Sequence, residues 1–250
     1  MLGSILSLTL IGAAALTTLV AIDWRKSLQN ISLLGLFLII LFLDNLILVG
    51  VNQYPSLLLV PNGRWGTVLI LWSGKLYSFF ACLTIVVLIR QAIPCRQLGL
   101  TLRQNERSVL PGLLVLLAVS LAAAWIGSGW DKGRFSLPVL IYMAIMPGLN
   151  EELVYRGLLL GILNRIKPPG WNLFGAEIGW GTVITALIFG LLHGFWVEPG
   201  FAFHFLWYPV VFSSVTGFLL AWQKERTGSL LIPVLSHGAI DFFISWVRMV

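Results

Sequence analysis

Three short groups of ionisable residues interrupt otherwise apolar stretches in the second half of the chain. The first contains Glu151, Glu152 and Arg156. On a helix, Glu152 and Arg156 are four residues apart, so the guanidinium can reach back to the carboxylate and hold it bidentately. Glu151 points about 100° away around the helix, where the local sequence offers it no cation. One neutralised carboxylate beside one free carboxylate is suited to general-base chemistry.

The other two groups carry histidine. His193 follows Phe189 and Gly190, which allow two helices to pack closely, and its ring can act as a base, a hydrogen-bond partner or a metal ligand. His237 and Asp241 are four residues apart and therefore face the same way on a helix. Asp241 could orient the ring of His237 or join it at one site.

Each group also has a purely structural interpretation. His193 alone could be a packing residue, Glu152 with Arg156 a solvated helix end, and His237 with Asp241 a structural hydrogen bond. Together the groups are harder to explain, because an ionisable side chain at membrane depth costs roughly 2.5–3.5 kcal/mol. Glutamate and two histidines on three separate apolar helices can converge only inside the bundle.

Composition indicates what positions these residues. The chain is 58% hydrophobic and only 10% charged, and its mean hydropathy is +0.92, whereas soluble domains have about 25% charged residues. The basic residues behind the net charge of +6 lie between apolar runs, which is typical of topology signals and anionic-lipid contacts rather than of nucleic-acid binding. Cys82 and Cys95 suggest two free thiols and no disulfide framework.

A transmembrane helix needs about 20 predominantly apolar residues. We therefore predict an all-α, polytopic membrane protein, a bundle of about eight transmembrane helices. The candidate spans are 2–22, 31–51, 66–89, 109–126, 137–163, 178–196, 201–222 and 229–247. They divide into an N-terminal membrane region, 1–130, and a second region, 137–247, that carries the three motifs.

Basic residues in the connecting loops predict the orientation. One side carries ten, namely Arg25, Lys26, Arg90, Arg96, Arg103, Arg107, Arg165, Lys167, Lys224 and Arg226. The other side carries four, namely Arg64, Lys132, Arg134 and Arg248. By the positive-inside rule the first set is cytoplasmic and both termini lie outside. The compact chain with short loops suggests a bacterial cytoplasmic membrane.

A few further polar residues stand in or beside the apolar runs. We interpret Asp44, Asn45 and Lys75 as structural residues that pair across helices, and His204 as a residue near the membrane interface.

The order EExxxR, FxxxH and HxxxN/D on late spanning helices resembles the CAAX prenyl protease and bacteriocin-processing family of intramembrane proteases, which includes the type II CAAX prenyl endopeptidase. The matching residues are Glu151, Glu152, Arg156, Phe189, His193, His237 and Asp241. The resemblance covers 137–247, and the first four spans match only in being hydrophobic.

The resemblance implies an eight-helix bundle that hydrolyses peptide bonds in a catalytic cavity open to the cytoplasm. It implies that Glu151 with His193 activates water, and that His237 with Asp241 stabilises the tetrahedral oxyanion. Glu152 and Arg156 would hold their helix in register. Its partners would be a peptide or protein substrate and the lipid bilayer, with no nucleic acid.

Two features of the motifs leave alternatives open. Many family members have Asn where this chain has Asp241, and an ionised Asp accepts hydrogen bonds but cannot donate them. Glutamate with two histidines resembles a zinc ligand set, so a divalent metal such as zinc and a metal-free glutamate mechanism are both consistent with the motifs. The sequence contains neither HExxH nor GxSxG.

Two other functions compete with proteolysis. A non-catalytic scaffold or chaperone of the same fold would retain the site for stability or ligand binding. A small proton-coupled transporter would use Glu151 and His193 as a proton relay, and it predicts inverted repeats, which the sequence does not display. The sequence specifies neither the substrate nor the oligomeric state.

Overall fold

The computed structural model describes residues 2–54, 57, 66–133, 136–198 and 200–249, with the backbone alone at 66–69. Among the described residues, five helices make up the first half. They are α1 (Leu2–Ile22), the short α2 (Trp24–Gln29), α3 (Ile31–Gln53), α4 (Gly66–Ile89) and α5 (Val109–Ser128). Each of the first four predicted spans corresponds to one of the long helices, and the ends differ by two residues at most.

The predicted fifth span is one continuous helix with an altered middle. It begins as α6 (Leu137–Glu151), widens into the π-helical segment η2 (Glu152–Leu159) and ends as α7 (Leu160–Ile166). Pro147 lies inside α6 and has no backbone N–H to donate, so the regular hydrogen-bond ladder is already broken just before the glutamates. The π-helical turns were not predicted, and such turns are often found at functional sites.

Two small antiparallel hairpins qualify the all-α prediction. β1 (Trp171–Leu173) pairs with β2 (Ala176–Ile178), and β3 (Phe195–Val197) pairs with β4 (Phe203–Phe205). The turn between β3 and β4 joins two strands, so the adjoining ends of the predicted spans 178–196 and 201–222 are wrong. Aromatic and β-branched residues flank that turn, and such residues favour strands. The helices of this half are α8 (Trp180–Gly194), α9 (Trp207–Thr227) and α10 (Leu231–Met249).

The chain is a multi-pass membrane protein. Among the described residues, five helices are long and apolar enough to cross a bilayer: Leu2–Ile22, Ile31–Gln53, Ile70–Ile89, Val109–Ser128 and Leu137–Ile166. The structure does not confirm eight spans. Helix α8 has only 15 residues, and α9 and α10 carry the polar residues that lower their hydropathy.

Helix α5 illustrates how side chains are distributed in the bundle. Its large residues Leu114, Leu121 and Trp125 are exposed, whereas its small residues Ser120 and Ala123 are buried. This pattern fits a helix whose outer face meets lipid and whose inner face packs closely on a neighbour, here α10.

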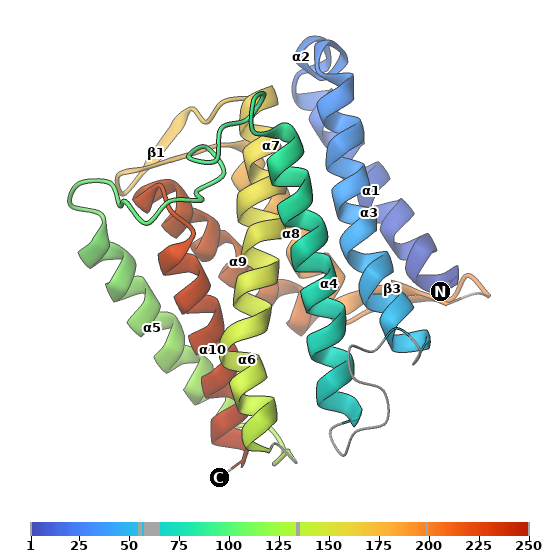
Figure 1. Cartoon of the computed structure of the whole chain (residues 1–250), viewed down its shortest axis with the longest axis vertical. Helices are drawn as coiled ribbons and strands as arrows, with labels where there is room; N and C mark the ends of the chain where they lie inside the picture. Colours follow the sequence, from blue (N-terminus) through green and yellow to red (C-terminus); the bar gives the residue numbers. More distant parts are fainter. Residues whose placement is uncertain (1, 55–56, 58–65, 134–135, 199, 250) are drawn as a thin grey trace.

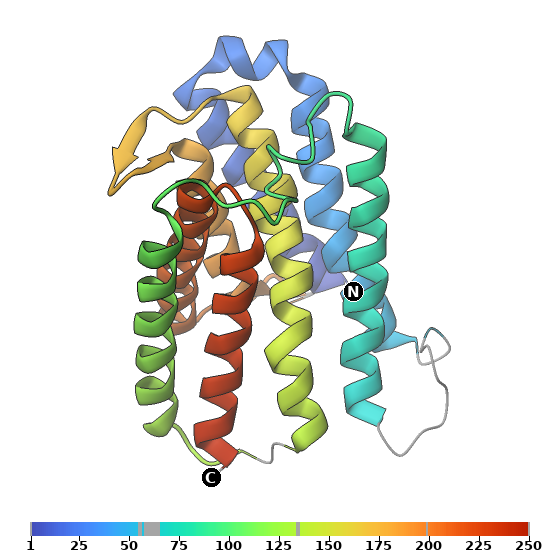
Figure 2. The same cartoon turned by 60° about the vertical axis from the view of Figure 1, so that its left-hand side comes forward.

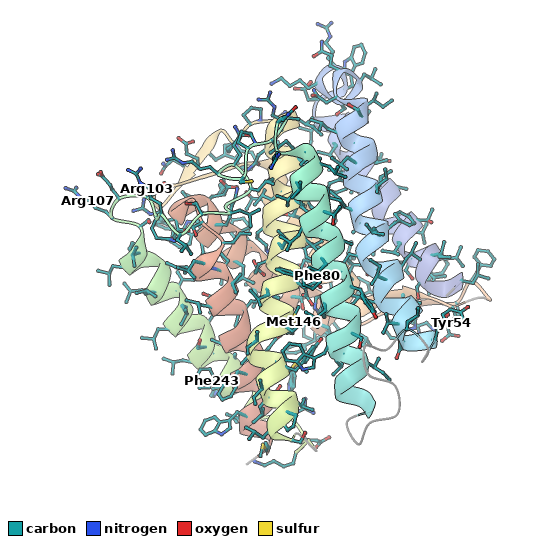
Figure 3. All side chains as sticks on the ribbon, in the orientation of Figure 1. Tyr54, Phe80, Arg103, Arg107, Met146 and Phe243 are labelled. Atoms are coloured by element: carbon teal, nitrogen blue, oxygen red, sulfur yellow. The ribbon has the colours of Figure 1, made fainter. Side chains whose placement is uncertain are left out.

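Helices α5, α10, α6 and α4 lie side by side in this order, as Figures 1 and 2 both show. Helix α4 packs against α6 and η2, and α3 packs against η2, so the N-terminal half covers one side of the helix that carries the glutamates. In Figure 3, Phe80 and Met146 lie midway along the bundle, while Arg103 and Arg107 lie toward one end.

Candidate active site

The first predicted pair is present and buried. Arg156 donates from Nη1 to Oε1 of Glu152 over 2.8 Å and from Nη2 to the carbonyl of Gly217 in α9 over 3.0 Å. Its guanidinium also lies 4.4 Å from the ring centroid of Phe189, within the range of a cation–π contact. The side chains of Glu152 and Arg156 are 0% and 1% exposed, so the interpretation as a solvated helix end is wrong.

His237 lies against both glutamates. Its Nδ1 is 2.6 Å from Oε1 of Glu152, and because an ionised carboxylate only accepts, the ring nitrogen donates. Its Nε2 lies 3.7 Å from Oε2 of Glu151 and 3.7 Å from Oδ2 of Asp241. Glu152 therefore orients the ring, a role that the sequence suggested for Asp241.

His193 is held at the site by Phe189 of its own helix rather than by a glutamate. Its Nδ1 donates to the carbonyl of Phe189 over 2.6 Å, which leaves Nε2 of the neutral ring as an acceptor. The Phe189 ring is 4.4 Å from the ring of His193 and 5.8 Å, edge to face, from that of His237. The ring of Phe189 thus contacts the rings of both histidines.

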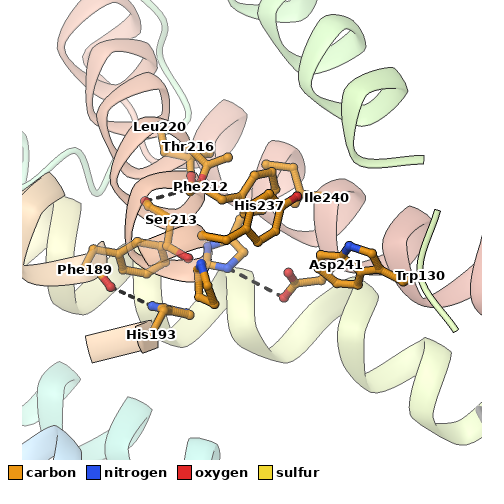
Figure 4. Close-up of a pocket in the computed structure, with 12 residues that line it drawn as sticks. Trp130, Phe189, His193, Phe212, Ser213, Thr216, Leu220, His237, Ile240 and Asp241 are labelled. Carbon is orange, nitrogen blue, oxygen red and sulfur yellow. Dashed lines mark hydrogen bonds and ion pairs between the residues drawn. The ribbon is translucent and has the colours of Figure 1, made fainter. Parts of the chain in front are cut away.

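A cavity of about 250 Å³ joins the second and third motifs. Figure 4 shows His237 between Phe189 and His193 on one side and Asp241 on the other. The remaining walls come from α9 and α10 and from Trp130. His193 is exposed, and Asp241 is partly exposed, so this cavity offers a peptide access to the imidazoles.

Close contacts between glycines and backbone bring α10 onto α6. A β-carbon on Gly148 would lie 2.7 Å from the carbonyl oxygen of Val234, and one on Gly238 would collide with the carbonyl of Ala144. Only glycine permits this approach. It places His237, next to Gly238, against the two glutamates that follow Gly148.

Lys75 is the functional candidate that sequence reasoning missed. Its Nζ lies 2.7 Å from Oε1 of Glu151, and the two side chains are 11% and 14% exposed. Glu151 has no cation on its own helix, as the sequence indicates, but the interpretation of Glu151 as a free carboxylate is wrong, because Lys75 of α4 pairs with it across helices. The available signal was a single lysine inside an apolar span.

Residues 133–243 match the family model described as "Type II CAAX prenyl endopeptidase Rce1-like". This part of the chain is an Rce1-like domain. It contains all three motifs and all six predicted site residues. At the level of the family, such a domain is that of a protease.

Two proteins of Bacillus subtilis are similar to the chain. "Putative membrane peptidase YdiL" is 26% identical over 197 residues, which cover 70% of each chain. "Uncharacterized protein YpbD" is 27% identical over 138 residues, which cover 52% of this chain and 60% of that protein. No solved structure matches the chain significantly.

One oxygen of each glutamate is already engaged by neighbouring side chains. Oε1 of Glu151 accepts from Lys75, and Oε1 of Glu152 accepts from both Arg156 and His237. Among the described residues, no three histidine, cysteine or acidic side chains converge as ligands. We therefore derive no catalytic step through a metal.

Proposed function

We propose that the chain is an intramembrane endopeptidase that hydrolyses a peptide bond in a membrane-associated or precursor peptide or protein. The observation that carries the proposal is the free oxygen of Glu151. Oε2 is buried and has no hydrogen-bond partner, and it lies 3.7 Å from Nε2 of His237. A buried carboxylate oxygen beside an imidazole nitrogen is an arrangement that can bind and activate a water molecule.

In the proposed reaction, Oε2 of Glu151 accepts a proton from this water as its oxygen attacks the carbonyl carbon of the scissile bond. Nε2 of His193, held as an acceptor by the bond from Nδ1 to Phe189, assists in orienting the water. When the tetrahedral intermediate collapses, the carbon–nitrogen bond breaks and the proton on Glu151 passes to the leaving amine.

The oxyanion is assigned to His237, whose Nε2 lies between Glu151 and Asp241. Nε2 of a protonated His237 would donate to it, with Glu152 fixing the ring through Nδ1. Asp241 lies 3.7 Å from the same Nε2. It would support the charge on the imidazolium when ionised or donate to the oxyanion when protonated.

The test is cleavage by purified protein in liposomes, with fluorogenic peptides of CAAX-like and leader-peptide-like sequence. We expect Glu151→Gln and His193→Ala each to lower kcat about 10²–10⁴-fold, the usual contribution of a general base. His204→Ala is the matched control, because His204 stacks on Trp196 in the β3–β4 hairpin and takes no part in the reaction. It should cleave like wild type.

A parallel assay with a chelator tests whether cleavage requires a metal. We expect cleavage to persist with chelator, and its loss together with restoration by zinc would overturn the metal-free mechanism. Undiminished cleavage by Glu151→Gln would exclude Glu151 as the base. If folded wild-type protein cleaves nothing while Glu151→Gln preserves its cellular role, the non-catalytic scaffold is the better explanation.

A further inference from the structure

Lys75 lies at a position where burial of a charged lysine is energetically unfavourable. It lies within the apolar helix α4 and is only 9% exposed, although an ammonium at membrane depth costs several kcal/mol on insertion scales unless it is paired. Its 2.7 Å contact with Glu151 supplies the counter-charge. Within the matched range 133–243, Arg156 is paired with Glu152, and Nε2 of His237 approaches Glu151 only to 3.7 Å.

A second link joins the same helices one turn away. Ser78, on the same helix as Lys75, donates to Asp44 in α3, and Asn150 in α6 donates from Nδ2 to Oγ of Ser78 over 3.0 Å. All three residues are buried. Asn150 directly precedes Glu151, so two successive side chains of α6 are both held from the N-terminal half.

The two oxygens of Glu151 consequently have different surroundings. Oε1 is held by Lys75, whereas Oε2 has no hydrogen-bond partner and lies 3.7 Å from Nε2 of His237. A carboxylate turns about its last side-chain bond unless something fixes it. The ammonium of Lys75 fixes that rotation and keeps Oε2 facing the imidazole.

We propose that Lys75 is a positioning residue for Glu151, so that helix α4, outside the Rce1-like domain, completes the proteolytic site. This inference rests on the proposed function. A positioning role differs from a purely structural role in one respect. A structural ion pair would affect only whether the protein folds, whereas a positioning residue affects kcat in protein that is already folded.

The experiment compares Lys75→Met, Lys75→Arg and Lys75→Ala with wild type in the liposome assay, after size-exclusion chromatography has selected folded protein. Lys26→Met is the matched control, because Lys26 is exposed on α2. We expect Lys75→Met to lower kcat about 100-fold, since a misplacement of about 1 Å has an effect of this size. KM should change by less than about threefold, and Lys75→Arg should keep at least about a tenth of kcat.

Chemical rescue gives a second readout that does not depend on Lys75→Met folding well. A cavity of about 380 Å³, lined by Lys75 itself and by Asn52, Gly74 and Tyr142, offers a small amine a way to the vacated position. Ethylammonium should raise the kcat of Lys75→Ala at least about tenfold and leave that of Glu151→Gln unchanged.

The outcomes separate the two proposals. If wild type cleaves and folded Lys75→Met cleaves with the same kcat, the positioning role is wrong and the proteolytic function stands. If no Lys75 variant yields folded protein and ethylammonium restores nothing, Lys75 serves the fold alone and the inference is overturned. If folded wild type cleaves no substrate, both proposals fail together.

Discussion

The carboxylate of Glu152 accepts hydrogen bonds from two residues on different parts of the bundle. Its Oε1 is 2.8 Å from Nη1 of Arg156 and 2.6 Å from Nδ1 of His237. Arg156 in turn donates to the backbone of Gly217. One fully buried carboxylate therefore connects η2, α9 and α10, and its neighbour Glu151 is left available for chemistry.

Removing the guanidinium of Arg156 should destabilise the whole fold. Arg156→Met would leave the Glu152 charge without its cation in a site that water does not reach, and a broken buried pair costs about 3–5 kcal/mol. We expect the free energy of unfolding in mixed micelles to fall by that amount. Arg90→Met, at an exposed position, should change it by less than about 0.5 kcal/mol. Equal effects of the two substitutions would contradict a buried pair.

The residues that could be predicted from the sequence are those whose partners are local. The spacing of Glu152 and Arg156 predicts their contact, because helical geometry alone brings residues four apart together. The partners of Glu151 and His237 could not be predicted in this way. Lys75 is 76 residues from Glu151 and His237 is 85 from Glu152, and the contacts depend on which helices are neighbours, a property of the whole bundle.

At the scale of elements, the contact between α6 and α10 decides whether the motifs meet. Gly148 and Gly238 face the opposite helix with no room for a side chain. The π-helical turns of η2 begin at Glu152, immediately after Glu151. Backbone proximity and local widening together bring two successive glutamates to the same imidazole.

Gly238→Ala should therefore separate α6 from α10 and disturb the site. The added methyl group would collide with the Ala144 carbonyl, and relieving the collision moves His237 away from Glu151. We expect cleavage to fall at least about tenfold and the thermal midpoint to drop. Gly35→Ala in α3 is the control, because nothing lies within 4 Å of its β-carbon. It should be neutral or stabilising by about 0.5–1 kcal/mol. Full activity of Gly238→Ala would show that the helices tolerate separation.

Hydropathy predicts helices better than it predicts their ends and their neighbours. The four N-terminal spans follow from long apolar runs. The β3–β4 hairpin was missed because Phe195, Trp196 and Val197 are as apolar as the helix that precedes them. The prediction of eight spans rests on the length of apolar runs alone, whereas α9 carries the polar residues Gln223 and Lys224, which are buried among its neighbours.

At the scale of the whole molecule, the basic loops form two groups, each with contacts of its own. In the larger group, Arg226 donates to the backbone of Arg107 and Lys167 lies 3.9 Å from Asp23. In the smaller group, Lys132 donates to the carbonyl of Val247. Arg64 and Arg134 lie outside the described residues. The asymmetry that the sequence predicts is thus an asymmetry between two ends of the bundle.

Native Cys95 provides a test of which end faces the cytoplasm. It is exposed in the loop that carries Arg96 and Arg103, whereas Cys82 is buried. If the positive-inside rule holds, a membrane-impermeant maleimide should label Cys95 in inverted vesicles and leave it unlabelled in intact cells. Cys95→Ser combined with Asp131→Cys moves the thiol to an exposed position at the other end, and the labelling pattern should reverse. Labelling of Cys95 in intact cells would place both termini in the cytoplasm and turn the proposed active site toward the opposite side.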